Sequence, residues 1–401
     1  MALDVVETLC SLVATPSVNP MGRDVSGDEF YEYRMTERLE GIFRELGLPF
    51  ERQQIAPRRS NIFARLDTSD QRSSDQLLVF EAHQDTVPVD GMTIPPWEPT
   101  VRDGRVYGRG SCDIKGGMAA MLAAVSRLAD DRPAGMPTII MACSVNEEHG
   151  FSGASDMASL WASGDSQLVP RKPDAVIVAE PTLLNVVVAH KGVSRWRIHT
   201  GGRACHSSSP HLGDNAIYHM ARVLSHLEEY ARDVAPTLGK HRLLGGPTIS
   251  VGMINGGISV NTVPDACFIE IDRRVLPGEN PLAARQHVID YLAAKLDKSV
   301  PITHENPFIA SGGLADDNNQ ELAAAVSRIA SGYGSPGERI GVPYGTDAPA
   351  FNAIQCPTIV FGPGSIEQAH TKDEWLAIEQ LKTAAEIYYQ IGKHGLGKNS
   401  E

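Results

Sequence analysis

Residues 77–88 read LLVFEAHQDTVP, a nearly continuous apolar run that ends in polar residues. A short apolar run without alternation is typical of a strand that is buried on both faces of a parallel sheet. Segments 137–145 and 175–179 have the same character, and segment 118–128, between the first two runs, has the apolar spacing of a helix. This β-α-β alternation predicts an α/β fold in which helices flank a mostly parallel sheet.

The pattern changes after Gly192, where apolar and polar residues alternate as in a sheet with one solvated face. We expect strands at 195–200, 248–254 and 266–275, and helices at 215–230 and 281–296. Together these segments predict a compact α+β domain.

The α/β pattern surrounds this domain on both sides. Before and after it we expect helices at 5–13, 29–46, 320–330 and 374–390 and a further strand at 358–361. The sequence therefore predicts a discontinuous catalytic domain made of residues 1–191 and 305–401, with an inserted domain at 192–304.

The composition sets broad limits on function. Of 401 residues, 42% are apolar and 21% are charged, and the net charge of −13 argues against nucleic acid or an anionic membrane as the main partner. No apolar run reaches the roughly 18 residues of a membrane span, and the first ten residues lack the basic start of a secretory signal. The six cysteines form no Cys-x-x-Cys pair. We therefore expect a soluble cytoplasmic protein.

Histidines and acidic residues gather where the predicted strands end. His83 and Asp85 lie two residues apart after the first run, so Asp85 can hold the imidazole ring, although a surface hydrogen bond explains this pair when it is taken alone. Asp113 follows the glycine-rich turn YGRGSC and precedes a predicted helix. That turn has neither the phosphate-loop nor the dinucleotide-binding spacing.

Four more residues complete this group. Glu147 and Glu148 follow the second predicted strand, and adjacent carboxylates repel each other unless a cation or a proton separates them. Glu180 follows the third strand, where an unpaired carboxylate is costly to bury, and His370 precedes the last helix. Two histidines and three carboxylates, with one glutamate to spare, are what a two-metal hydrolase needs.

Through nearly its whole length the chain resembles a group of co-catalytic zinc hydrolases, which contains the acetylornithine deacetylases, succinyl-diaminopimelate desuccinylases and glutamate carboxypeptidases. The resemblance rests on five motifs in the same order: His83-x-Asp85, GRGSCDIKGG at 108–117, Glu147-Glu148, Glu180-Pro181 and Ala369-His370. Within the group, GPGSIEQAH at 362–370 and AHKG at 189–192 most resemble the acetylornithine deacetylases.

The resemblance implies two zinc ions, with Co²⁺ or Mn²⁺ as substitutes. The implied ligands are a bridging Asp113, with His83 and Glu180 for one ion and Glu148 and His370 for the other. Glu147 is implied as the general base and then the acid, and Asp85 as the residue that orients the ring of His83.

The resemblance also implies that the inserted domain is a lid through which two chains form a homodimer. His206 is implied to stabilise the oxyanion across the dimer, although a histidine in such a loop is otherwise a capping or surface residue. Asn261 and Arg274 match positions that bind the substrate carboxylate, and the adjacent Arg273 leaves the choice of arginine open. A substrate-lining loop is implied at Gly345 and Thr346, where a plain turn is nearly as good an explanation.

The expected reaction is hydrolysis of the amide bond of an N-acyl amino acid. The substrate implied by the resemblance is N2-acetyl-L-ornithine, which gives L-ornithine and acetate in arginine biosynthesis. A succinyl-diaminopimelate desuccinylase or a broader carboxypeptidase or aminoacylase stays open, and Lys191, Arg195 and Arg203 are candidate cations for a succinyl carboxylate. A non-catalytic metal-binding protein is the alternative of another class, and Glu147 argues against it because metal binding alone needs no spare carboxylate.

Overall fold

The structure, a computed structural model, describes residues 2–67 and 76–396 and divides into two compact units. The first unit consists of residues up to 188 together with 316–340 and the chain from 346 onward, and the second consists of 189–315 and 341–345. The second unit extends past the expected range 192–304 because strand β15 (Ile309–Ser311) pairs with β9 (Gly192–Gly201).

An eight-stranded sheet forms the centre of the first unit, in the order β1-β2-β6-β3-β7-β17-β8-β16. The strands are β1 (Phe50–Ala56), β2 (Arg59–Leu66), β3 (Leu77–His83), β6 (Thr138–Ser144), β7 (Ala175–Val178), β8 (Val186–His190), β16 (Arg339–Val342) and β17 (Thr358–Val360). The four central strands β6, β3, β7 and β17 are parallel, as predicted. Strands β2 and β8 run antiparallel to their neighbours in this central set, so the whole sheet is mixed.

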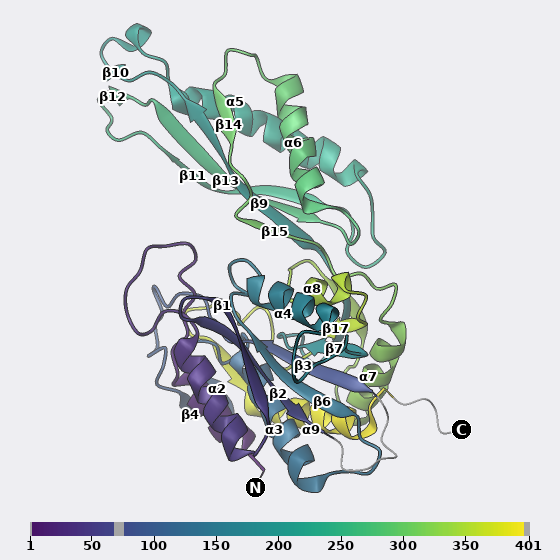
Figure 1. Cartoon of the computed structure of the whole chain (residues 1–401). Helices are drawn as coiled ribbons and strands as arrows, with labels where there is room; N and C mark the ends of the chain where they lie inside the picture. The colour runs from purple at the N-terminus through teal and green to yellow at the C-terminus, as the bar shows by residue number, and fades with distance from the viewer. Residues whose placement is uncertain (1, 68–75, 397–401) are drawn as a thin grey trace. The chain divides into compact units, whose positions relative to one another are not determined.

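Helices cover both faces of this sheet, α4 (Ser152–Ser163) and α8 (Ala348–Ala353) on one face and α3 (Lys115–Asp131) and α9 (Ile378–His394) on the other (Figure 1). Trp161 of α4 stacks on Phe351 of α8 with ring centroids 5.6 Å apart. Tyr388 of α9 packs edge-on against Phe80 of β3 at 5.3 Å. Every residue of β3 is buried, which explains why its sequence does not alternate.

The remaining helices of the first unit are α1 (Val5–Val13), α2 (Tyr33–Glu45) and α7 (Gln320–Gly332). Among the described residues, no helix combines the length and the apolar character that crossing a membrane would require.

Two predicted helices begin later than expected. The helix expected at 374–390 begins at Ile378, because Trp375–Ala377 form strand β18, which pairs with β5 (Arg105–Tyr107) in a small sheet with β4 (Thr100–Arg102). The helix expected at 29–46 begins at Tyr33, since Phe30 instead forms a bridge with Val18. The first difference comes from pairing with a distant strand and the second from an isolated bridge, and helical spacing reveals neither.

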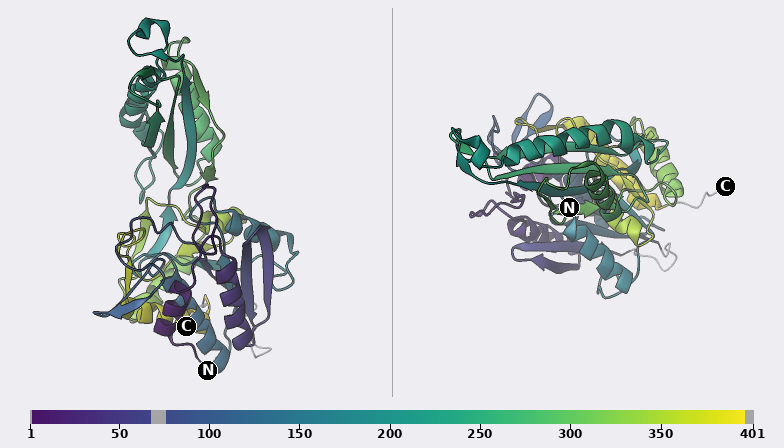
Figure 2. Two further views of the ribbon diagram at one scale, coloured as in Figure 1. Left: turned by 90° about the vertical axis from the view of Figure 1, so that its left-hand side faces the viewer. Right: turned by 90° about the horizontal axis from the view of Figure 1, so that it is seen from above.

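The second unit is built on an antiparallel sheet in which β11 (Thr248–Gly256), β13 (Ala266–Val275), β9 and β14 (Ile302–His304) lie in that order, with β15 also paired to β9. Strands β9, β11 and β13 run side by side along the unit (Figures 1 and 2). Asn215 and Asn280 accept backbone N–H bonds at the starts of helices α5 (Ala216–Glu229) and α6 (Pro281–Lys295).

The two helices pack on one face of this sheet. Trp196 of β9, Ile269 of β13, Met220 of α5 and Val288 of α6 belong to a single buried cluster. On the opposite face, residues between the buried ones form ion pairs, such as that between Arg197 and Glu270 at 2.8 Å. The alternation predicted for this domain therefore has one apolar and one solvated side.

Candidate metal centre

Each of the four central parallel strands leads into a residue of the candidate site. His83 is the last residue of β3, Glu147 and Glu148 lie just beyond β6, Glu180 follows β7, and His370 lies in the loop after β17. The carboxyl ends of parallel strands meet at one edge of the sheet, which is where open α/β sheets bind ligands.

A glycine-rich turn brings Asp113 to the same edge. Gly110 has a φ of +81°, a conformation that favours glycine. At the start of α3, a Cβ atom on Gly116 would lie 2.5 Å from the backbone oxygen of Ser111, so only glycine fits there. The turn thereby places Asp113 immediately before the helix, with its side chain 8% exposed.

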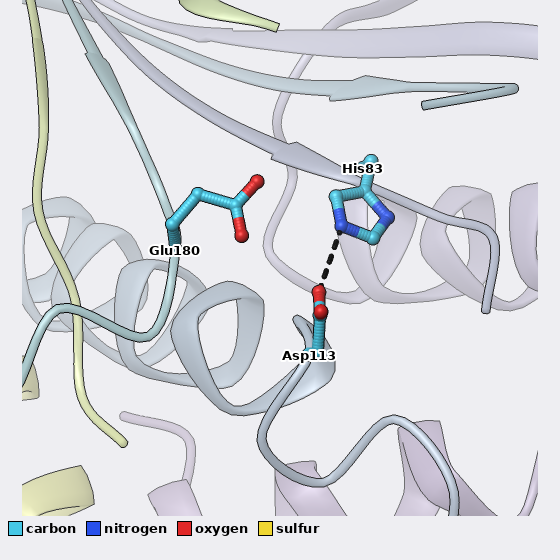
Figure 3. A group of neighbouring side chains, drawn as sticks. All are labelled: His83, Asp113 and Glu180. Carbon is cyan, nitrogen blue, oxygen red and sulfur yellow. Dashed lines mark hydrogen bonds and ion pairs between the residues drawn. The ribbon is translucent and has the colours of Figure 1, made fainter. Parts of the chain in front are cut away.

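Asp113 lies between two histidines. Its Oδ1 is 3.2 Å from Nε2 of His83, and its Oδ2 is 3.3 Å from Nε2 of His370, which in turn lies 3.2 Å from Oε2 of Glu148. Two sets of residues each offer three ligand atoms within 4.8 Å of one another: His83, Asp113 and Glu180 (Figure 3), and Asp113, Glu148 and His370. Asp113 is common to both sets and turns one oxygen toward each, so these residues fit a pair of metal ions bridged by one carboxylate.

Burial and neighbouring charges shift the pKa values of the residues in these two sets. Burial raises the pKa of Glu180 well above its usual range, and the nearby Asp113 raises it further. Burial also raises the pKa of Glu148. Burial alone would lower the pKa of His83, but the hydrogen bond to Asp113 and the surrounding carboxylates raise it well above its usual value. Protons held in this way are released when metal ions bind, because the ligands must then be deprotonated.

Glu147 belongs to neither ligand set. Its side chain is buried, and burial raises its pKa well above the usual range; His83 opposes this shift and Glu180 adds to it. A carboxyl group that lies beside a candidate metal centre and is not used as a ligand can accept a proton and return it.

The side chain of Asp85 holds the backbone that carries the two glutamates. Its Oδ1 accepts the N–H of Glu147 and its Oδ2 accepts the N–H of Glu148, each at 3.1 Å, and Oδ2 also accepts the side-chain amide of Asn19 at 2.8 Å. Nδ1 of His83 lies 2.9 Å from the backbone oxygen of Asp85 and 3.7 Å from its carboxylate. The backbone oxygen is thus the nearer partner of the ring.

Sequence reasoning missed two buried carboxyl groups close to the site. Asp347 accepts a hydrogen bond from Oγ of Ser144 at 2.7 Å, and burial raises the pKa of Asp347 to about 7. Glu81 is fully buried, and burial, together with the charge of Asp347, raises the pKa of Glu81 to about 8. A signal existed for Glu81, which is the charged residue within an otherwise apolar strand, whereas nothing in the segment PYGTDAPAF marks Asp347 as buried.

Two other predicted site residues lie together in the second unit. His206 is on β10 (Cys205–His206), which pairs with β12 (Thr262–Val263), and Asn261 directly precedes β12. Both are exposed, Nδ1 of His206 lies 2.8 Å from Oγ of Ser208, and the backbone oxygen of Asn261 accepts the N–H of Ser207.

The two adjacent arginines have different surroundings. Arg273 is fully buried, and its Nη2 donates to Glu279 at 2.7 Å. The side chain of Arg274 is 23% exposed, and its Nε donates to Asp272 at 2.7 Å. Arg274 is therefore the more accessible of the two.

The loop predicted at 345–346 divides between the units. Gly345 belongs to the second unit and Thr346 to the first, where the buried Oγ1 of Thr346 accepts the N–H of Ala348 at 3.1 Å.

Comparisons with known proteins agree on one family. The profile of Peptidase family M20/M25/M40 matches residues 79–394. The chain is 31% identical over 391 residues to an acetylornithine deacetylase of Edwardsiella ictaluri, and the match covers 96% of both chains.

Solved structures show the same fold. A family M20 metallo-carboxypeptidase of Sulfolobus solfataricus has a TM-score of 0.76 at 18% identity, covering 98% of this chain and 99% of that one. A dinuclear metal binding peptidase of family M20 from Bacillus subtilis has a TM-score of 0.64 at 16% identity, covering 97% and 96%.

Proposed function

The chain belongs to Peptidase family M20/M25/M40, and from this membership we propose that it is a metal-dependent amidohydrolase that removes the acetyl group of N2-acetyl-L-ornithine. The products are L-ornithine and acetate. The similarity to acetylornithine deacetylases over nearly the whole chain supports this substrate.

One observation carries the reaction class. Two sets of His and carboxylate ligands share Asp113, and Glu147 lies beside them as a buried carboxyl group that neither set uses. Nitrogen and oxygen donors of this kind bind Zn²⁺, Co²⁺ and Mn²⁺. We propose zinc as the native metal, because the group of hydrolases that share this order of motifs is a group of zinc enzymes.

The residues of the chain have distinct roles in the proposed mechanism. His83, Asp113, Glu148, Glu180 and His370 would hold the ions, which when bound would supply Lewis-acid polarisation of the acyl carbonyl and a more acidic water. Glu147 takes a proton from the attacking water and later delivers it to the departing amine, a role open to it because neither ligand set uses its carboxyl group. Asp85 keeps Glu147 in place through the N–H bonds that its carboxylate accepts.

We further propose that the active protein is a homodimer formed through the second unit. Strand β11 lies at the edge of its sheet, and a sheet edge offers unpaired backbone groups to a second chain. Large apolar side chains are exposed on the second unit close to this edge in sequence, among them Met253, Ile254, Ile258 and Val260, of which Val260 is 99% exposed. In such a dimer His206 of one chain would donate to the oxyanion formed in the other.

The carboxylate of the amino acid is assigned to Arg274 and Asn261. The guanidinium group of Arg274 can donate two parallel hydrogen bonds to a carboxylate, and Arg274 is more accessible than Arg273.

The test is amine release from four substrates by the Zn²⁺- or Co²⁺-loaded protein: N-acetyl-ornithine, N-acetyl-methionine, N-succinyl-diaminopimelate and a glutamate-terminated dipeptide. We expect selective turnover of N-acetyl-ornithine that is lost in Glu147→Ala while both metal ions remain bound. Turnover of another member of the panel would keep the mechanism and reject the substrate. No turnover by the protein with two bound ions would point first to an acyl group outside the panel and then to the non-catalytic alternative.

A further inference from the structure

A buried glutamate outside both ligand sets contacts the backbone of the turn that presents Asp113. Oε1 of Glu374 accepts the N–H groups of Cys112 at 2.8 Å and of Asp113 at 3.0 Å. Its Oε2 accepts the N–H of Gly110 at 2.9 Å and Nη1 of Arg109 at 2.7 Å. Both oxygens thus accept two hydrogen bonds each.

The backbone of Glu374 contributes to the same contact, since its carbonyl oxygen accepts the N–H of Gly108 at 3.0 Å. The side chain is fully buried, so water does not compete for these bonds. A turn whose N–H groups converge on one carboxylate has little freedom to move, and the direction of the Asp113 side chain is fixed with it.

The position of Glu374 in the chain links this turn to a second ligand. Glu374 lies four residues after His370, whereas the turn at 108–113 lies about 260 residues earlier. One carboxylate therefore ties together the two segments that carry Asp113 and His370. Those two residues belong to the same ligand set, and Asp113 belongs to both sets.

The charge of Glu374 is balanced without the help of a metal ion. Arg109 is 3% exposed, pairs with Oε2 of Glu374, and donates through Nη2 to the backbone oxygen of Pro88 at 3.3 Å. A buried carboxylate needs such a partner, and this one leaves both oxygens of Asp113 free to face the two histidines.

We propose that Glu374 is a positioning residue of the metal centre, which sets its metal affinity by fixing Asp113 relative to His370. The inference rests on the proposed metal-dependent function. Residues that orient metal ligands without touching the metal typically contribute roughly 10- to 100-fold in metal affinity.

A second glutamate, Glu51, also accepts backbone N–H groups, so its substitution controls for a role in stability alone. Oε2 of Glu51 accepts Oγ of Ser166 at 2.9 Å and the N–H groups of Gln167 and Leu168 at 3.0 and 3.1 Å. Glu51 thus holds a loop of the first unit in the same manner, but that loop carries no residue of either ligand set.

The experiment compares Glu374→Gln, Glu51→Gln and Asp373→Asn, the last of which removes an exposed charge next to Glu374. Zn²⁺ affinity is measured by competition with a chelator, the Co²⁺-loaded proteins are examined by visible absorption, and thermal unfolding is followed for each. We expect Glu374→Gln to bind Zn²⁺ roughly 10- to 100-fold more weakly and to change the Co²⁺ spectrum, because an amide cannot accept both pairs of N–H groups. We expect both controls to bind Zn²⁺ like the wild type.

Wild-type Zn²⁺ affinity in Glu374→Gln, with a loss of thermal stability like that of Glu51→Gln, would overturn the proposal. If Glu374→Gln does not fold, Glu374→Asp decides by the same measurement: weaker binding supports the role, and unchanged binding refutes it. A wild-type protein that binds fewer than two ions would instead contradict the proposed metal centre itself.

Discussion

The two sheets place functional residues in opposite ways. In the first unit, buried parallel strands end at one edge, where His83 lies 3.2 Å from Asp113 and His370 lies 3.2 Å from Glu148. In the second unit, the strands have one solvated face, His206 and Asn261 are exposed, and the side chain of Arg274 is partly exposed. The first arrangement gathers a candidate metal site within one unit, whereas the second leaves its predicted site residues accessible to solvent.

This difference assigns separate tasks to the units. A rigid, buried sheet suits chemistry that needs fixed ligand positions, and exposed side chains on a separate unit suit recognition of a substrate or a second chain. The comparison predicts that changes in the first unit alter metal content and proton transfer, and that changes in the second unit alter substrate affinity and cooperation between chains.

The largest effect is expected for the ligand that both metal sets share. Asp113→Ala should lose both ions and lower kcat by roughly 10⁴-fold or more, because both ligand sets then lack a member. His370→Ala, which touches one set, should keep one ion. Metal content per chain by atomic emission, together with kcat, distinguishes them, and two tightly bound ions in Asp113→Ala would contradict the bridging role.

The second prediction joins the two units. Glu147→Gln and His206→Ala should each be nearly inactive, since they remove the proposed general base and the proposed donor to the oxyanion; one such donor is worth roughly 10²–10³ in kcat. In the proposed dimer, where His206 of one chain acts in the site of the other, each mixed dimer of the two variants contains one site with both residues intact. After subunit exchange, an equal mixture should therefore recover up to about a quarter of wild-type activity.

Differently tagged chains show whether mixed dimers have formed in that experiment. If mixed dimers form but no activity is recovered, His206 does not act in the site of the other chain. Activity of His206→Ala alone at the wild-type rate would remove it from the mechanism.

A smaller effect is expected for substrate recognition by the second unit. Arg274→Met should lower kcat/KM by roughly 10- to 100-fold, mainly through KM, because a hydrogen bond to a charged group contributes about 1.5–3 kcal/mol. Arg197→Met removes an exposed arginine of β9 that is paired with Glu270 and serves as the control. An unchanged KM in Arg274→Met would place the carboxylate elsewhere.

The smallest effect concerns stability in the first unit. Burial raises the pKa of Glu32 to about 8, and the charge of Asp85 raises it further, while Arg59 opposes the shift. A carboxyl group whose pKa is raised by folding stabilises the protein most below its unfolded pKa, near 4.5, and this contribution is lost as the pH rises toward 8.

Glu32→Gln should therefore become more stable relative to the wild type as the pH rises from 5 to 8. Melting temperatures across that range measure the difference, and Glu37→Gln, an exposed change on α2, the helix that begins directly after Glu32, is the control. A difference that does not vary with pH would show that Glu32 does not hold a proton in the folded protein.

The central strands and the residues that follow them could be predicted from the sequence because an apolar run in the sequence marks each of these strands. His83, Glu147 and Glu180 were found in this way, as polar residues at the end of such runs. The pattern is local, so it reveals only what neighbours in the chain have in common.

Features that depend on distant contacts escaped prediction. Glu374 accepts hydrogen bonds from N–H groups about 260 residues away in the chain. Trp375–Ala377 form a strand because Arg105–Tyr107 lie beside them. The nearer ring partner of His83 is a backbone oxygen, which side-chain chemistry does not suggest.

One connection in the second unit has a consequence for how the family can diversify. Strand β9, near the start of that unit, pairs with β15, near the end of its main segment, so that Val193 lies opposite Ser311. The segment between β9 and β15 is therefore a loop whose two ends are paired with each other. The entropic cost of closing such a loop grows only with the logarithm of its length. Insertions, deletions and whole exchanges between these two strands cost the host sheet little. Evolution can thus vary the sequence of the second unit while the candidate metal ligands at the strand ends stay where they are.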